Sequence, residues 1–161
     1  VITIGSIHGG VRGNIIPDTV EMIGTIRNFD DDVRKELLTR LERTATAIAS
    51  AAGAEATVTI YPYSGVTWND PDLTARMLPS LQSAAQTVIE GPIVMGAEDF
   101  SWYQKQIPGL FVMLGVNMPG VSADQAAPNH SPLFVVNESA LKTGVRTLST
   151  LALDYLQQQP R

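Results

Sequence analysis

The sequence has 161 residues, of which 44% are hydrophobic and 17% are charged, with a net charge of −5 and no cysteine. This composition is typical of a globular protein with a buried core and excludes a disulfide-stapled or disordered chain. The eleven basic residues are scattered, which argues against a nucleic-acid partner. No apolar run reaches the roughly 20 residues that span a bilayer, which argues against a membrane-spanning protein.

The chain opens in the middle of a strand pattern. Residues 1–7 read Val-Ile-Thr-Ile-Gly-Ser-Ile, with neither a start methionine nor a signal peptide, so we expect the chain to begin inside a larger protein. A loop with three glycines follows, and residues 19–27 again place alternate apolar side chains on one face. The two runs predict a β-hairpin with a long loop.

The clearest predicted helix follows the hairpin. Asp30 and the next two aspartates supply a cap and negative charge at its start, and Gly53 ends it. Between them, apolar residues recur every three or four positions. Residues 54–61 alternate apolar and polar side chains and predict a third strand. The first half is therefore predicted to be β-β-α-β, with the helix on one face of an antiparallel sheet.

A change of pattern at residues 62–66, Pro-Tyr-Ser-Gly-Val, marks the candidate domain boundary. Asp70 and the proline after it then open a helix, and a last helix starts at Asn137. Short apolar runs at 92–95 and 110–115 predict buried strands between them.

His130 is the first candidate for chemistry. It precedes a Ser-Pro pair, so we expect it on extended or turn-like backbone in a loop. His8 is the other histidine, and it has no partner motif; we assign it to a loop or lid. A zinc site needs about three or four protein ligands. Either His130 is an ordinary loop histidine, or the rest of its metal site lies outside this chain.

A second candidate group follows the predicted strand at 92–95. Gly96 allows the backbone to approach a ligand closely, and Glu98 follows one residue beyond Ala97. We expect Glu98 to face a pocket and Asp99 to cap a short helix. The alternative is that both acids only cap that helix.

Asn14 and Arg27 form the third candidate group. An arginine fork and an amide together make a good clamp for a carboxylate, because their donors match its two oxygens. Considered locally, Arg27 is instead a surface charge paired with Glu21 or Asp30, and this alternative stays open.

Three segments, taken together, resemble the zinc-dependent aminoacylase and carboxypeptidase family of metallohydrolases. They are residues 13–27, residues 95–100, and residues 129–134 together with 137–141. The resemblance is to the branch of N-acyl-amino-acid amidohydrolases, which includes hippurate hydrolase and the auxin-conjugate hydrolases. Each motif is weak alone, but three in the family's order are specific.

The resemblance implies an α/β catalytic domain with a two-metal centre of zinc, manganese or cobalt, and an inserted ferredoxin-like βαββαβ lid that mediates dimerisation. Residues 1–64 correspond to the latter part of the lid and residues 65–161 to the carboxy-terminal part of the catalytic domain.

The resemblance also implies roles for particular residues. His130 matches the family's last metal ligand. Asn14 and Arg27 match lid residues that contact substrate, Arg27 through the substrate carboxylate. The turn Gly96-Ala97-Glu98 matches a loop that lines the substrate pocket.

The departures from the family pattern are equally specific. The first histidine motif, the bridging ligand, the paired glutamates and the later histidine before the lid are absent from these residues. Asn129 also stands where a second histidine is expected. We therefore assign no catalytic residue to this segment, expect at most one metal ligand, and expect the segment alone to be inactive.

The predicted function of the whole protein is hydrolysis of the amide bond of an N-acyl amino acid or small peptide-like conjugate, by a homodimer whose default location is the cytoplasm. The rival is a non-catalytic dimerisation or ligand-binding module. A third possibility, that the motif matches are chance, requires three coincidences in family order.

Overall fold

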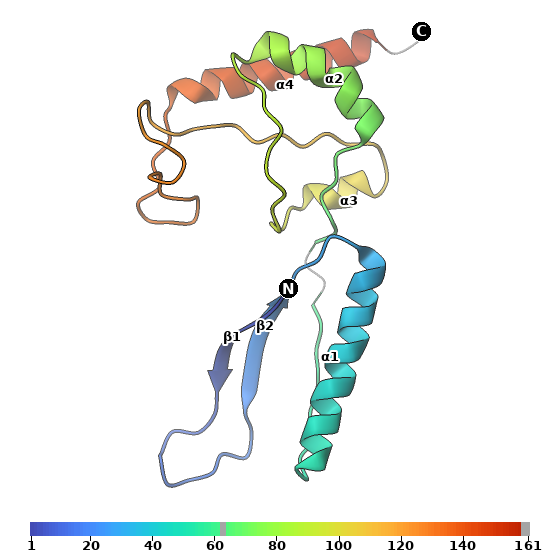
Figure 1. The fold of residues 1–161 in the computed structure, drawn as a ribbon, viewed down its shortest axis with the longest axis vertical. Helices are drawn as coiled ribbons and strands as arrows, with labels where there is room; N and C mark the ends of the chain where they lie inside the picture. The colour runs from blue at the N-terminus through green and yellow to red at the C-terminus, as the bar shows by residue number, and fades with distance from the viewer. Residues whose placement is uncertain (62–63, 159–161) are drawn as a thin grey trace. The chain divides into compact units, whose positions relative to one another are not determined.

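The structure, a computed structural model, describes residues 1–61 and 64–158 and combines helices with a small sheet (Figure 1). Its elements are β1 (Ile2–His8), β2 (Glu21–Ile26), α1 (Asp31–Ala51), α2 (Pro71–Ala84), α3 (Phe100–Gln104) and α4 (Ser139–Gln157). The predicted mixed α/β class is confirmed.

The chain divides into two compact units. The first contains residues 1–67 and 94–102, and the second contains residues 68–93 and those from 103 onward. Pro62 and Tyr63, at the predicted boundary, lie outside the described residues. The assignment of 1–64 and 65–161 to separate domains stays a prediction.

In the first unit, β1 and β2 form the predicted antiparallel hairpin. His8 lies opposite Glu21 at the loop end, and at the other end the Arg27 amide donates a hydrogen bond of 2.8 Å to the Val1 carbonyl. A Cβ atom at Gly24 would collide with a carbonyl oxygen of β1, so the close approach of the strands requires glycine there. The register therefore fixes which residues lie at each end of the hairpin.

Helix α1 begins and ends as predicted. The Asp30 carboxylate caps it by accepting hydrogen bonds of 2.8 Å from the amides of the helix's second and third residues. At the other end Gly53 adopts a φ of 72°, and the Ala54 amide donates to the Ala49 carbonyl at 2.9 Å. This is a Schellman ending, in which glycine takes the left-handed conformation at no steric cost.

The prediction that α1 covers one face of the sheet is wrong. Met22 and Ile23 point to opposite faces of the hairpin and are 62% and 56% exposed. No side chain of α1 is fully buried either. The apolar stripe of α1 is real in the sequence, but the described part of the first unit contains too little packed structure to bury it.

Three predicted strands are also wrong, because residues 54–61, 92–95 and 110–115 adopt no regular structure. A strand exists only where a neighbouring backbone supplies its hydrogen bonds, and within 1–61 and 64–158 no strand pairs with any of these segments. Ile93 and Met113 in the two apolar runs are 86% and 74% exposed. These two segments have the composition of buried strands, yet their apolar side chains are exposed in the part of the chain that the structure describes.

The second unit is built on the packing of α2 against α4. Three apolar side chains are fully buried in the described residues, and all lie on α2: Met77, Leu81 and Ala84. The Ser80 hydroxyl donates a hydrogen bond of 2.6 Å to the Asp154 carboxylate, and the Arg76 guanidinium lies 4.5 Å from the ring centre of Tyr155. Polar and cation–π contacts therefore fix the register of the two helices around a small core.

The caps of the second unit explain its helix boundaries. Asp70 caps α2 by accepting a 2.8 Å hydrogen bond from the Leu73 amide, as predicted. Helix α4 starts two residues later than predicted, because the Asn137 side chain accepts hydrogen bonds from Ser139 instead of entering the helix. Across 1–61 and 64–158, no helix is both long and apolar enough to cross a membrane.

The Asp30 cap gives a direct test of the first unit. Asp30→Ala removes both hydrogen bonds to the first turn of α1 and should lower the free energy of unfolding by about 1 kcal/mol, measured by urea denaturation. Asp30→Asn is the matched control and should stay close to the wild type, since asparagine caps equally well. Equal loss of stability in both variants would contradict the capping role.

Candidate functional site

Arg27 directly follows β2, and its guanidinium reaches a segment far along the chain. Its Nη1 donates a hydrogen bond to the carbonyl of Met95, one residue before the candidate turn at 96–98. Arg27 forms no ion pair with Glu21 or Asp30, so the alternative that it is a surface charge paired with one of these acids is not supported. The first unit thus joins one member of the third candidate group, Arg27, to the residue before the second candidate group.

The turn at 96–98 leads into α3, and the carbonyl of its last residue, Glu98, is hydrogen-bonded to the start of that helix. The Glu98 carbonyl accepts hydrogen bonds from the Ser101 amide at 3.2 Å and from the Ser101 hydroxyl at 2.7 Å. The Glu98 side chain is half-buried, and its carboxylate has no hydrogen-bond partner within residues 1–61 and 64–158. The backbone carbonyls of Glu98 and Asp99, rather than their predicted acidic side chains, therefore accept these hydrogen bonds from the first residues of α3.

Ser101 is a residue that the sequence did not single out. Its side chain is fully buried, and its hydroxyl also accepts a 3.0 Å hydrogen bond from the Gly65 amide. A serine in the first turn of a short helix is common, so the only indication in the sequence is its place directly after the Glu-Asp-Phe motif. Its importance lies in contacts with residues far away in the chain.

Asn14 lies in the loop that joins β1 to β2, whereas Arg27 lies at the opposite end of the same hairpin (Figure 1). At about 3.3 Å per residue, the paired strands separate them by roughly 20 Å. Within this chain the hairpin therefore does not bring Asn14 beside Arg27, and the role of each in binding a carboxylate stays a prediction. An antiparallel register keeps the loop and the open end apart, whatever the motif order suggests.

His130 belongs to the second unit and lies in an exposed turn. The Ser131 amide donates to the Pro128 carbonyl at 3.1 Å, and His130 between them has a φ of 72°. This left-handed conformation is uncommon outside glycine, although histidine, asparagine and aspartate adopt it more often than other residues. The imidazole is accessible and is not sealed in an apolar niche.

The fit of this chain to a metal centre is partial. An exposed imidazole on a turn has the right chemistry for a zinc ligand. The described residues contain no group of three His, Cys, Asp or Glu side chains that could hold a metal. These residues therefore fit a contribution of one ligand, and they do not form a metal site by themselves.

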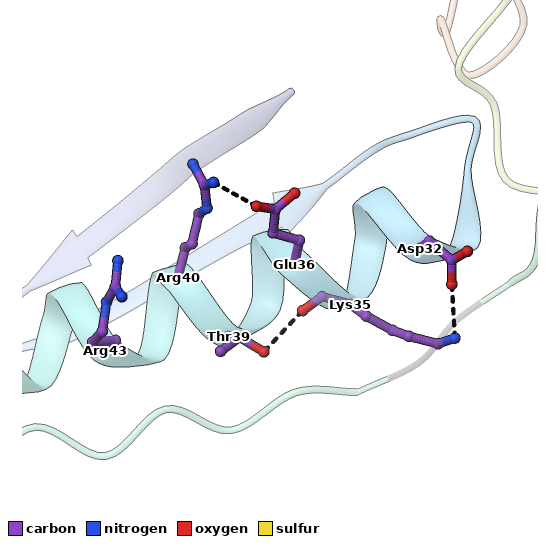
Figure 2. Close-up of a pocket in the computed structure, with 6 residues that line it drawn as sticks. All are labelled: Asp32, Lys35, Glu36, Thr39, Arg40 and Arg43. Carbon is purple, nitrogen blue, oxygen red and sulfur yellow. Dashed lines mark hydrogen bonds and ion pairs between the residues drawn. The ribbon is translucent and has the colours of Figure 1, made fainter.

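A hollow on the surface of α1 is a further candidate for a binding site (Figure 2). Only α1 side chains line it: Asp32, Lys35, Glu36, Thr39, Arg40 and Arg43. Lys35 donates a hydrogen bond of 2.9 Å to Asp32, which raises the pKa of the Lys35 ammonium, and Arg40 pairs with Glu36. These are exposed pairs one turn apart, which describe a solvated helix face rather than a binding site.

Residues 3–154 match the family described as Peptidase family M20/M25/M40. The chain belongs to this peptidase family. The resemblance carried by the three motifs is thereby confirmed, and chance agreement is excluded as their explanation.

Three relatives show how much of their own length this chain covers. Thermostable carboxypeptidase 2 of Saccharolobus solfataricus is 37% identical over 159 residues, covering 96% of this chain and 39% of its own length. N-acetylcysteine deacetylase of Bacillus subtilis is 30% identical over 157 residues, covering 98% of this chain and 40% of its own length. The crystal structure of the Bacillus subtilis YXEP protein, a dinuclear metal binding peptidase, matches with a TM-score of 0.77 and 30% identity over 99% of this chain and 42% of that one. The chain therefore spans about two fifths of the length of these relatives.

Proposed function

We propose that this chain is the carboxy-terminal part of a metal-dependent amidohydrolase that cleaves the amide bond of N-acyl amino acids or small peptide-like conjugates. The match of residues 3–154 to the peptidase family carries the proposal. Among the relatives, one is named a deacetylase of N-acetylcysteine and another a carboxypeptidase. Both names describe hydrolysis of an amide bond next to an amino acid that bears a carboxylate.

In this proposal residues 1–64 are the latter part of a ferredoxin-like lid and residues 65–161 the end of the catalytic domain. The apolar side chains exposed on the hairpin and in the runs at 92–95 and 110–115 support it, because such surfaces normally lie against other structure. We also propose that the lid forms a homodimer interface and that the enzyme works in the cytoplasm.

His130 supplies one ligand to a two-metal centre, and the remaining ligands come from outside these residues. When bound, the metals polarise the amide carbonyl and acidify water. The turn at 128–131 holds the imidazole out from the backbone, where a metal can reach it. The left-handed backbone at His130 is a strained geometry of the kind that functional sites retain.

Arg27 binds the carboxylate of the substrate. A guanidinium has five N–H donors, and the hydrogen bond to Met95 uses one of them. The others remain available for a carboxylate, with which an arginine fork forms two parallel hydrogen bonds. The same contact joins Arg27 to the residue that precedes Gly96, Ala97 and Glu98, which we propose to line the substrate pocket. Asn14 also contacts substrate, from the hairpin loop rather than beside Arg27.

His130→Asn in the full-length protein tests the metal ligand without disturbing the turn, since asparagine tolerates a positive φ. We expect the loss of at least one metal per chain. Loss of a residue that only hydrogen-bonds to a metal ligand typically lowers metal affinity or activity by about 10- to 100-fold. Loss of the ligand itself should therefore lower kcat/KM by at least about a hundredfold. Metal content by elemental analysis and hydrolysis of N-acetylcysteine and hippurate are the measurements.

His8→Asn is the matched control, because His8 is the only other histidine of the chain. It should keep both the metal and the activity. A His130→Asn protein with the metal content of the wild type would show that His130 is an ordinary loop residue. A wild-type protein with neither metal nor hydrolysis would favour the non-catalytic module.

Arg27→Ala should raise KM for hippurate by about 10- to 100-fold, because a charge-assisted hydrogen bond is lost. Arg27→Lys keeps the positive charge but loses the forked guanidinium, so its KM for hippurate should lie between those of the wild type and Arg27→Ala. The amide of hippurate, which lacks the carboxylate, provides the decisive comparison. The wild type should prefer hippurate strongly, and Arg27→Ala should lose that preference. If the variant keeps the preference, Arg27 serves only to bind the Met95 carbonyl.

A further inference from the structure

Among the described residues, one hydrogen bond on each side of the candidate turn joins the segment 94–102 to the rest of the first unit. On one side Arg27 donates to the Met95 carbonyl, and on the other the Gly65 amide donates to the Ser101 hydroxyl at 3.0 Å. Along the sequence, the residues before and after this segment belong to the second unit. The turn therefore owes its position to contacts with residues distant in the chain.

Ser101 is the more constrained of these two attachment points. Its side chain has an exposed fraction of 0%, whereas Arg27 is exposed. The Ser101 hydroxyl uses its proton to bond the Glu98 carbonyl at 2.7 Å and uses an oxygen lone pair to accept from Gly65. A buried hydroxyl with both functions satisfied holds its partners firmly, because water is not available to replace either bond.

We propose that Ser101 is a positioning residue for the substrate pocket. Its hydroxyl joins the Glu98 carbonyl to the Gly65 backbone and so sets where Gly96, Ala97 and Glu98 face the substrate. The proposal rests on the proposed function only in assigning that turn to the substrate pocket. The hydroxyl needs no contact with substrate, because it acts through the backbone that ends the turn.

The size and chemistry of Ser101 both matter to this role. Alanine would remove the donor to Glu98 and the acceptor for Gly65, leaving the Ser101 amide as the remaining hydrogen bond to the Glu98 carbonyl. Cysteine has nearly the same shape but is a weak donor and a weak acceptor. A graded series of serine, cysteine and alanine therefore separates loss of the hydrogen bonds from loss of volume.

Ser80 is a matched control for a purely structural serine. It is also buried, on α2, and its hydroxyl donates to Asp154 at 2.6 Å. Ser80→Ala should cost stability for the same physical reason as Ser101→Ala. It does not belong to the turn or to the first unit.

The experiment compares Ser101→Ala, Ser101→Cys and Ser80→Ala in the full-length enzyme by two measurements. The first is hydrogen exchange of peptides that contain the Gly65 amide and the amides of 96–101, without substrate. The second is steady-state hydrolysis of N-acetylcysteine and hippurate. In Ser101→Ala we expect faster exchange in both peptides and a KM raised about three- to tenfold, with kcat within about twofold of the wild type.

Ser101→Cys should lie between alanine and the wild type in both measurements. Ser80→Ala should lower the thermal midpoint while leaving KM and the exchange of both peptides unchanged. If Ser101→Ala and Ser80→Ala lose similar stability and neither changes KM or exchange, Ser101 is only structural and the proposal is overturned. If the wild type hydrolyses neither probe, the proposed function is what has failed, and the exchange of 96–101 still decides whether the hydroxyl holds the turn.

Discussion

The antiparallel register of β1 and β2 determines where the candidate site residues of the first unit lie. It places Arg27 beside Val1 at the open end of the hairpin, with their backbones joined by hydrogen bonds. From there the guanidinium reaches the Met95 carbonyl, 68 residues further along the chain. The same register sends the loop that carries Asn14 to the far end. One pairing pattern therefore brings Arg27 to the residue before the turn at 96–98 and keeps Asn14 away from both.

The helices could be predicted from the sequence because their stabilising groups are local. Asp30 and Asp70 cap α1 and α2 through amides two or three residues away, and Gly53 ends α1 within its own turn. Strands are different, because their hydrogen bonds come from distant backbone. In the hairpin, β1 and β2 supply each other's hydrogen bonds within 27 residues of sequence, so both strands form. The apolar runs at 92–95 and 110–115 have no such neighbour, so their composition alone misled the prediction.

For the candidate site, the sequence singles out residues but does not give their positions. The motif order singled out Arg27 and the turn at 96–98, and the structure joins Arg27 by a hydrogen bond to Met95, the residue before that turn. It could not show that Asn14 lies elsewhere, because two residues 13 positions apart can be close or far depending on the turn between them. The sequence did not single out Ser101 either, because its contact is also with a residue distant in the chain. Its importance comes from Gly65, 36 residues earlier, and no local pattern encodes that contact.

Two independent features of the described residues point in the same direction. A single imidazole, His130, has the chemistry of a metal ligand but lacks companions. Ile93 and Met113, in runs suited to a buried sheet, are largely exposed. A self-sufficient dimerisation module would explain the first feature but not the second, since such a module would bury its own apolar runs and expose only its interface. The amidohydrolase proposal accounts for both, because the structure that would cover these runs is also the source of the other metal ligands.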